Sequence, residues 1–176
     1  FPGLHPPLPE GALTETQKRP PGQATRARCR DRNPKGIEDH DGSQSMRATI
    51  AVIAISRKGS KLARRLSASL GDVTTLILDR RFSDASESAS VFDLPVRPVV
   101  EQAFDEYQHL VLFMPVGAAV RLLASRLKNK HHDPAVVCVD DAGRYAVSLL
   151  SGHAGGADDL TRRVASILGS EPVITS

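Results

Sequence analysis

The chain has 176 residues, with 23 Lys and Arg against 20 Asp and Glu, so its formal net charge is only +3. This length suits one domain with a core of useful size. The near balance of charges, the few aromatic residues and the absence of Trp exclude a typical nucleic-acid-binding protein. Membrane spans need roughly 18 or more consecutive apolar residues, and no apolar run approaches that length.

Residues 1–45 differ in composition from the rest of the chain. They hold seven of the twelve prolines but only five large apolar side chains. Such a segment buries too little apolar surface to offset its ordering entropy, and it lacks the apolar run of a secretory signal. We therefore expect 1–45 to be a disordered extension, Met46 to be the natural start, and 46–176 to form one domain.

Two cysteines, Cys29 and Cys138, fall in that extension and in a predicted core strand. This placement argues against a disulfide and favours a reducing compartment, so we expect a cytoplasmic protein.

From Met46 onward the apolar pattern predicts alternating strands and helices. Predicted strands cover 49–55, 73–78, 110–114, 135–139, 145–150 and 172–175, and predicted helices cover 60–70, 99–107, 118–128 and 157–168. Residues 79–90, rich in Ser, Asp and Glu, are predicted to form a loop. The helix over 118–128 is expected to bury a stripe formed by Val120, Leu123, Ala124 and Leu127.

The turn from Asp140 to Gly143, between two predicted strands, is a β-hairpin signal. Alternating strands and helices with one hairpin predict a three-layer, Rossmann-like α/β fold with a mostly parallel sheet.

Three junctions between a strand and a helix combine glycine with a helix start: 56–59, 115–117 and 151–156. Ligands of open α/β sheets lie at the carboxyl ends of the strands, so we expect the three junctions to meet there. The expected substrate-binding residues are Arg57, Lys58, Gly117, Arg121, Ser151 and Gly152, with the cations meeting carboxylates or phosphate. Taken singly, each cation is more often just a solvated charge.

His153 and the two glycines that follow, Gly155 and Gly156, are the predicted catalytic residues. Backbone amides at the head of a helix stabilise an oxyanion, and a histidine beside them has a pKa suited to a general base. The alternative is a histidine that only bonds a nearby carbonyl. Ser151 is better explained as a turn residue than as a nucleophile, because no G-x-S-x-G elbow is present.

Other polar clusters have structural explanations that we favour. Asp140 and Asp141 are a candidate carboxylate pair, but an acid before glycine more often caps a hairpin turn. The run from His131 to Asp133 resembles a metal patch without a third placed ligand. Neither a dinucleotide fingerprint nor a P-loop is found, and we expect no metal site and no cofactor.

The sequence from Asp133 to Leu160, DPAVVCVDDAGRYAVSLLSGHAGGADDL, closely resembles the amino-terminal region of the CbiG family, as do 113–124, 46–70 and the closing PVIT at 172–175. The resemblance covers essentially all of 46–176 and none of 1–45. It implies a cobalt-precorrin-5A hydrolase of anaerobic cobalamin biosynthesis, whose substrate is a cobalt-containing, acid-rich tetrapyrrole with a δ-lactone. The implied reaction opens the lactone with water and releases acetaldehyde, with the cobalt carried by the substrate.

Two departures from the family pattern stand out. The family usually has Asn where this chain has Asp158, and an acid there would repel an anionic substrate. Family members also continue beyond the PVIT motif into a carboxyl-terminal domain, so we expect activity to need such a domain, as in a fragment or a split enzyme. The alternatives are a non-catalytic tetrapyrrole- or polyanion-binding module that acts with a partner chain, and an unrelated small esterase-like hydrolase.

Overall fold

A computed structural model describes residues 49–129 and 131–175. The expectations for the extension 1–45, for Met46 and for Cys29 lie outside the described residues. No helix in the described ranges is long and apolar enough to cross a membrane.

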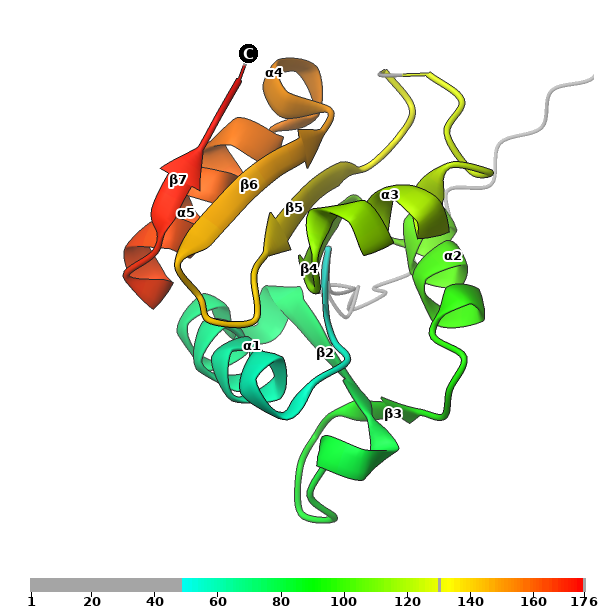
Figure 1. The fold of residues 1–176 in the computed structure, drawn as a ribbon, viewed down its shortest axis with the longest axis vertical. Helices are drawn as coiled ribbons and strands as arrows, with labels where there is room; N and C mark the ends of the chain where they lie inside the picture. Colours follow the sequence, from blue (N-terminus) through cyan, green and yellow to red (C-terminus); the bar gives the residue numbers. More distant parts are fainter. Residues whose placement is uncertain (1–48, 130, 176) are drawn as a thin grey trace, which may run out of the picture. The chain divides into compact units, whose positions relative to one another are not determined.

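A seven-stranded sheet, in the order β3-β2-β1-β4-β5-β6-β7, forms the middle layer (Figure 1). The strands are β1 (Ile50–Ala54), β2 (Thr74–Asp79), β3 (Ser90–Phe92), β4 (His109–Phe113), β5 (Ala135–Val139), β6 (Tyr145–Leu150) and β7 (Glu171–Val173). The helices are α1 (Arg57–Leu70), α2 (Arg97–Glu106), α3 (Val116–Leu123), α4 (Gly152–Gly155) and α5 (Ala157–Leu168), with short 3₁₀ turns η1 (Gly71–Val73) and η2 (Arg80–Phe82).

Helices cover both faces of this sheet, as the continuously apolar strands predict. Alternate residues of β1 point to opposite faces, so that Val52 packs with α1 and α5 while Ile53 packs with α2 and α3. The expected three-layer α/β fold is confirmed.

Five strands are parallel and two run the other way. β3, β2, β1, β4 and β5 pair in parallel, whereas β6 pairs with β5 in an antiparallel hairpin and β7 follows β6 in parallel. The hairpin expected at the Asp140–Gly143 turn is confirmed. Because of it, β6 ends at the edge of the sheet where β5 begins, with Leu150 paired to Val136.

Two predicted helices differ in their details. α1 begins at Arg57 rather than after Ser60, because Ser56 is the N-cap and Ser60 is buried with its hydroxyl donated to the Ser56 carbonyl. α3 ends at Leu123, and the predicted buried stripe is mostly wrong: Leu123 is buried, but Val120 is 48% and Leu127 44% exposed. Helical periodicity marks an apolar stripe, but it does not show whether another layer covers it.

The segment predicted as a loop over 79–90 contains structure. It holds the turn η2 directly after β2 and the first residue of the edge strand β3. β3 is only three residues long, too short for its alternation to be read from the sequence.

Candidate functional site

The order of the parallel strands defines one position at which a ligand is expected. Successive connections leave β1 toward β2 and β3 on one side and return to β4 and β5 on the other, so the order reverses between β1 and β4. In open α/β sheets, ligands bind at such a reversal, outside the carboxyl ends of the strands. Here the loops after β1 and β4 start α1 and α3, which lie on opposite faces of the sheet (Figure 1). We call this region the carboxyl edge.

Ser56 organises the start of α1 at the carboxyl edge. Its Oγ accepts a hydrogen bond from the Gly59 amide at 3.0 Å and donates one to Asp141 Oδ1 at 2.7 Å. Asp141 belongs to the β5–β6 hairpin, so the first turn of α1 is tied to that hairpin. A Cβ on Gly59 would lie 3.0 Å from the Phe113 Cβ, and α1 therefore approaches β4 this closely only with glycine at the position.

Four of the predicted binding residues lie on the two helices that begin at the carboxyl edge, two on α1 and two on α3. Arg57 and Lys58 begin α1, and both are exposed. On α3, Arg121 Nη1 donates to the Gly117 carbonyl at 3.3 Å, which holds the guanidinium beside the start of that helix. This edge therefore carries three cations near the strand-order reversal.

Sequence reasoning missed a group of residues that extends the same edge. Arg57 shares a pocket of about 200 Å³ with residues of α1 and of the segment after β2, including Lys61, Arg64, Arg81, Phe82 and Asp84. We call it the cationic pocket. The signal available in the sequence was the run from Arg80 to Phe82, because it directly follows a predicted strand and so falls at the carboxyl edge.

The glycine-rich junction lies at the opposite edge, so the expectation that all three junctions meet is wrong. Since β6 is antiparallel to β5, residues 151–156 follow β6 at the edge where β1, β4 and β5 begin. Figure 1 shows α4 beyond the arrowhead of β6, and α1 beside the other end of the hairpin. Strand β1 has five residues, which separates the two edges by about 16 Å at roughly 3.3 Å per residue. His153, Gly155, Gly156, Ser151 and Gly152 are thus not part of the cationic site.

The backbone of the glycine loop is largely engaged in its own turn. The amides of Gly155 and Ala157 both donate to the Ser151 carbonyl, at 3.0 and 3.3 Å. Ser151 itself has a left-handed conformation (φ 55°), and its Oγ donates to the Asp133 carbonyl at 2.9 Å. The preference for Ser151 as a turn residue is consistent with these bonds, whereas the Gly155 amide is already used and is not presented to an oxyanion.

His153 is exposed on the four-residue helix α4. Within residues 49–129 and 131–175 its side chain makes no hydrogen bond, which excludes the alternative of a histidine held by a nearby carbonyl there. A pocket of about 420 Å³ at this edge is lined by Gly156, His109 and Arg163 among others, but His153 is not one of its lining residues. Its catalytic role stays a prediction.

Asp158 is buried and does not lie on the surface of the domain. It is 9% exposed, and Ser148 of β6 donates a hydrogen bond to its Oδ1 at 2.7 Å. The acid at this position therefore anchors α5 to the sheet, and the repulsion of an anionic substrate stays a prediction.

The structural explanations of the other polar clusters agree with the geometry. Asp140 accepts the amides of Ala142 and Tyr145, which caps the hairpin turn and lowers the pKa of its carboxyl against the opposing effect of partial burial. Asp133 accepts the Lys128 amide and so closes its own loop. Across 49–129 and 131–175, no group of three or more potential ligands is arranged for a metal ion.

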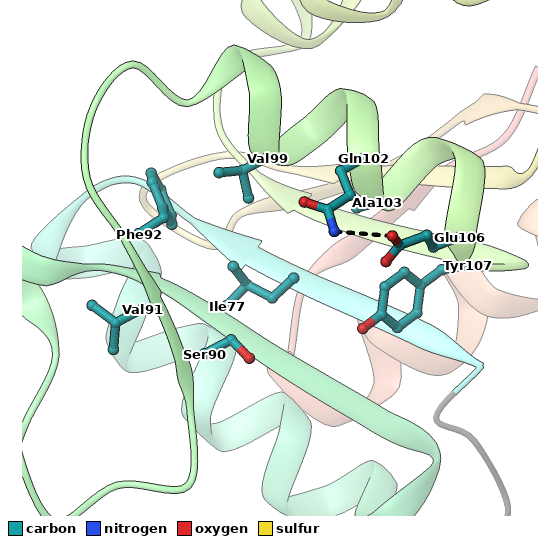
Figure 2. Close-up of a pocket in the computed structure, with 9 residues that line it drawn as sticks. All are labelled: Ile77, Ser90, Val91, Phe92, Val99, Gln102, Ala103, Glu106 and Tyr107. Atoms are coloured by element: carbon teal, nitrogen blue, oxygen red, sulfur yellow. Dashed lines mark hydrogen bonds between the residues drawn. The ribbon is translucent and has the colours of Figure 1, made fainter.

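A further pocket, of about 220 Å³, lies between α2 and the strands β2 and β3 (Figure 2). Its walls are mainly apolar, with Ile77, Phe92 and Val99 facing it. Its acid, Glu106, is bonded to Gln102 at 2.9 Å. No cation lines this pocket, so it does not suit an acid-rich ligand.

Fold and site together define a Rossmann-like α/β domain whose carboxyl edge is lined by cations. Residues 98–176 match the family model described as cobalamin synthesis G N-terminal. The resemblance predicted from the sequence is confirmed: the chain matches the CbiG family through the amino-terminal region of that family.

Curated relatives and a solved structure agree with this assignment. The chain is 38% identical over 134 residues to the cobalt-precorrin-5A hydrolase of Priestia megaterium, and 41% identical over 128 residues to that of Salmonella typhimurium. These matches cover 75% and 73% of this chain but 36% and 35% of the relatives. A crystal structure of a cobalamin biosynthesis protein G homologue from Sulfolobus solfataricus matches with a TM-score of 0.55 and 27% identity, over 74% of this chain and 37% of that one. The chain thus spans about a third of the length of the relatives it matches.

Proposed function

We propose that this domain is the amino-terminal part of a cytoplasmic cobalt-precorrin-5A hydrolase of cobalamin biosynthesis. The observation that carries the proposal is the identity of 38% and 41% to two curated proteins of that name, over 134 and 128 residues. The cation-lined carboxyl edge supports it, because the proposed substrate is an acid-rich tetrapyrrole that brings its own cobalt.

The proposed reaction has two bond-breaking stages. Water adds to the lactone carbonyl, and the tetrahedral oxyanion then collapses with cleavage of the ring C–O bond, which leaves a carboxylate and a hydroxyl group. In the second stage the C–C bond to the hydroxyl-bearing carbon breaks. The electron pair of that bond stays with the macrocycle, the hydroxyl loses its proton, and the two-carbon fragment leaves as acetaldehyde.

The contribution of this domain is proposed to be binding and orientation of the substrate. Arg57, Lys58 and Arg121 lie around the strand-order reversal, where guanidinium and ammonium groups form charge-assisted hydrogen bonds with carboxylates. Holding the lactone in a fixed orientation lowers the barrier to water attack by removing rotational and translational freedom beforehand.

The position of His153 makes it a separate hypothesis within this function. A general base acts within hydrogen-bond reach of its water, about 3 Å. His153 lies at the other edge of the sheet, so it cannot activate water for a lactone held at the carboxyl edge of the same domain. We propose that the substrate binds at the carboxyl edge. His153 could act as the base only if the substrate bound at the opposite edge, where β1, β4 and β5 begin, which we call the amino edge.

The curated relatives indicate how this domain works with a partner. The matched region is about a third of each curated relative, so we propose that a carboxyl-terminal CbiG-like region works with this domain. A non-catalytic module that holds a tetrapyrrole for a partner chain is less favoured, since both curated relatives are named as hydrolases.

The test is acetaldehyde release from cobalt-precorrin-5A. The full chain is assayed alone and together with the carboxyl-terminal region of the Priestia megaterium relative, and acetaldehyde is measured by coupled oxidation of NADH with alcohol dehydrogenase. We expect acetaldehyde in proportion to the substrate opened, at least in the combined assay. Binding of the substrate without acetaldehyde in either assay would contradict the hydrolase and support the binding module.

A further inference from the structure

We propose that the cationic pocket beside α1 binds one short carboxylate arm of the tetrapyrrole. The inference rests on the proposed function for the identity of the ligand. The pocket itself, however, is defined by contacts that do not depend on any relative.

Two of its four cations already have carboxylate partners. Arg64 donates from Nε and Nη2 to Glu87, at 2.5 and 2.8 Å, and also donates from Nη2 to the Phe82 carbonyl at 2.7 Å. Arg81 donates from Nε and Nη2 to Asp79, at 3.0 and 2.7 Å. These pairs fix the walls of the pocket, and in each pair the carboxylate balances the charge of the guanidinium.

The other two cations have no such partner. Arg57 and Lys61 are exposed, and neither makes a hydrogen bond or ion pair within the described residues. They are four residues apart on α1, so they face the same side of the helix, where two like charges are mutually destabilising. The first turn of α1 also contains no acid. The two charges therefore repel each other across this side of the helix, and an anion bound between them would relieve that repulsion.

Phe82 gives the pocket an apolar surface next to its charges. Its ring lies 5.8 Å from the Cζ of Arg57 and 5.2 Å from the Cζ of Arg81, as centroid distances. Cations at this range are attracted to the ring face, which orders both guanidiniums. An apolar ring flanked by cations suits a carboxylate on a short methylene chain, whose stem packs on the ring while its oxygens meet the nitrogens.

The acid that lines the pocket does not neutralise it. The Asp84 side chain is 80% exposed and lies 3.6 Å from Arg64, not from Arg57 or Lys61. An ion pair this exposed contributes little energy and is screened by salt. The four cations and Asp84 that line the pocket leave a net charge of +3, and the partners of Arg64 and Arg81, Glu87 and Asp79, reduce the local net charge to +1.

The experiment measures binding of uroporphyrin, a tetrapyrrole with a carboxylate at the end of every peripheral side chain. The full chain is added in steps to uroporphyrin at low ionic strength, and the fluorescence of the porphyrin is measured after each addition. The test variant is the double substitution Arg57→Gln and Lys61→Gln. The matched control replaces two cations outside the pocket, Arg65→Gln on the same helix and Arg163→Gln on α5, both exposed. This control removes the same net charge.

We expect the test variant to bind uroporphyrin about tenfold or more weakly, because each charge-assisted hydrogen bond contributes substantially to affinity. The control should bind as the wild type does. Inorganic phosphate, added at the concentration of the porphyrin carboxylates, should displace little of it, since phosphate has no stem to pack on Phe82.

Three results of the binding measurement would overturn the proposal, and one of the phosphate competition would too. The first three are no binding by the wild type, binding by the test variant equal to that of the wild type, and equal weakening in the control. The last result would mean that net charge alone attracts the porphyrin. Efficient displacement by phosphate would likewise remove the carboxylate assignment. None of these depends on acetaldehyde release, so failure of the pocket and failure of the hydrolase are distinguished.

Discussion

Ser56 Oγ lies 2.7 Å from Asp141 Oδ1, and this hydrogen bond joins two residues that are 85 positions apart in the chain. It ties the first turn of α1 to the β5–β6 hairpin at the carboxyl edge. The same oxygen caps α1 through the Gly59 amide. A single hydroxyl therefore positions the helix that carries Arg57, Lys58 and Lys61.

Replacement of Ser56 by Ala should destabilise the domain. It removes the N-cap of α1, and the loss of a serine cap costs about 1 kcal/mol in proteins. Urea unfolding should show a lower midpoint with an unchanged slope. Ser69→Ala is the control, because the Ser69 hydroxyl only bonds the Arg65 carbonyl on the exposed side of the same helix. Equal stability of Ser56→Ala and Ser69→Ala would contradict the capping role.

Two glycines at the carboxyl edge should respond oppositely to alanine. A Cβ at Gly59 would lie 3.0 Å from the Phe113 Cβ and 3.1 Å from Ser56 Oγ, and overpacking of this kind costs roughly 1–3 kcal/mol. A Cβ at Gly117 meets only the mobile end of Arg121, at 3.7 Å, so alanine there should be neutral or stabilising by up to about 1 kcal/mol, as in other helices. Thermal unfolding of both variants tests this prediction: the midpoint temperature should fall in Gly59→Ala and should be unchanged or higher in Gly117→Ala.

Acid should weaken the domain through Glu87. Hydrogen bonding to Arg64, the largest cause, lowers the pKa of the Glu87 carboxyl below its ordinary value of 4.5, against the opposing effect of burial. Because the folded-state pKa is depressed, the stabilisation is fully present above the ordinary value and is lost as pH falls below it. In Glu87→Gln the free energy of unfolding should be lower at pH 7 and should fall less between pH 5 and pH 3, by urea titration. An unchanged pH dependence would contradict the pairing.

Cys138 should be unreactive in the folded protein. Burial in β5 raises the pKa of its thiol to about 12, and the thiolate is the form that attacks a disulfide such as Ellman's reagent. In a Cys29→Ser background, Ellman's reagent should detect no thiol at pH 8 until denaturant is added. Rapid reaction before unfolding would show that this strand opens locally.

His153→Ala should leave acetaldehyde release unchanged, because the substrate is proposed to lie at the opposite edge. Loss of a general base would reduce the rate by roughly 100-fold or more. A loss of that size with uroporphyrin binding intact would move the reacting centre to the amino edge and support the catalytic role predicted from the sequence. The assay is the combined acetaldehyde assay, with Ala154→Gly on the same short helix as the control.

The sequence by itself determined the alternation of strands and helices, the hairpin at 140–143 and the family, because each depends on residues that are close together in the chain. α5 begins and ends at the predicted residues, and Gly169, in a left-handed conformation (φ 71°), caps its carboxyl end. The Asp140–Gly143 turn also implied that β6 runs antiparallel to β5, a consequence that the expectation of three meeting junctions did not take into account.

Only the tertiary structure decided which strands are neighbours and which loops meet. The Ser56–Asp141 bond and the contact of α1 with the Arg80–Phe82 turn join segments far apart in sequence. Such contacts arise from packing of whole layers against one another, which local periodicity does not specify. The exposure of Val120 has the same origin, since an apolar stripe is buried only where another layer covers it.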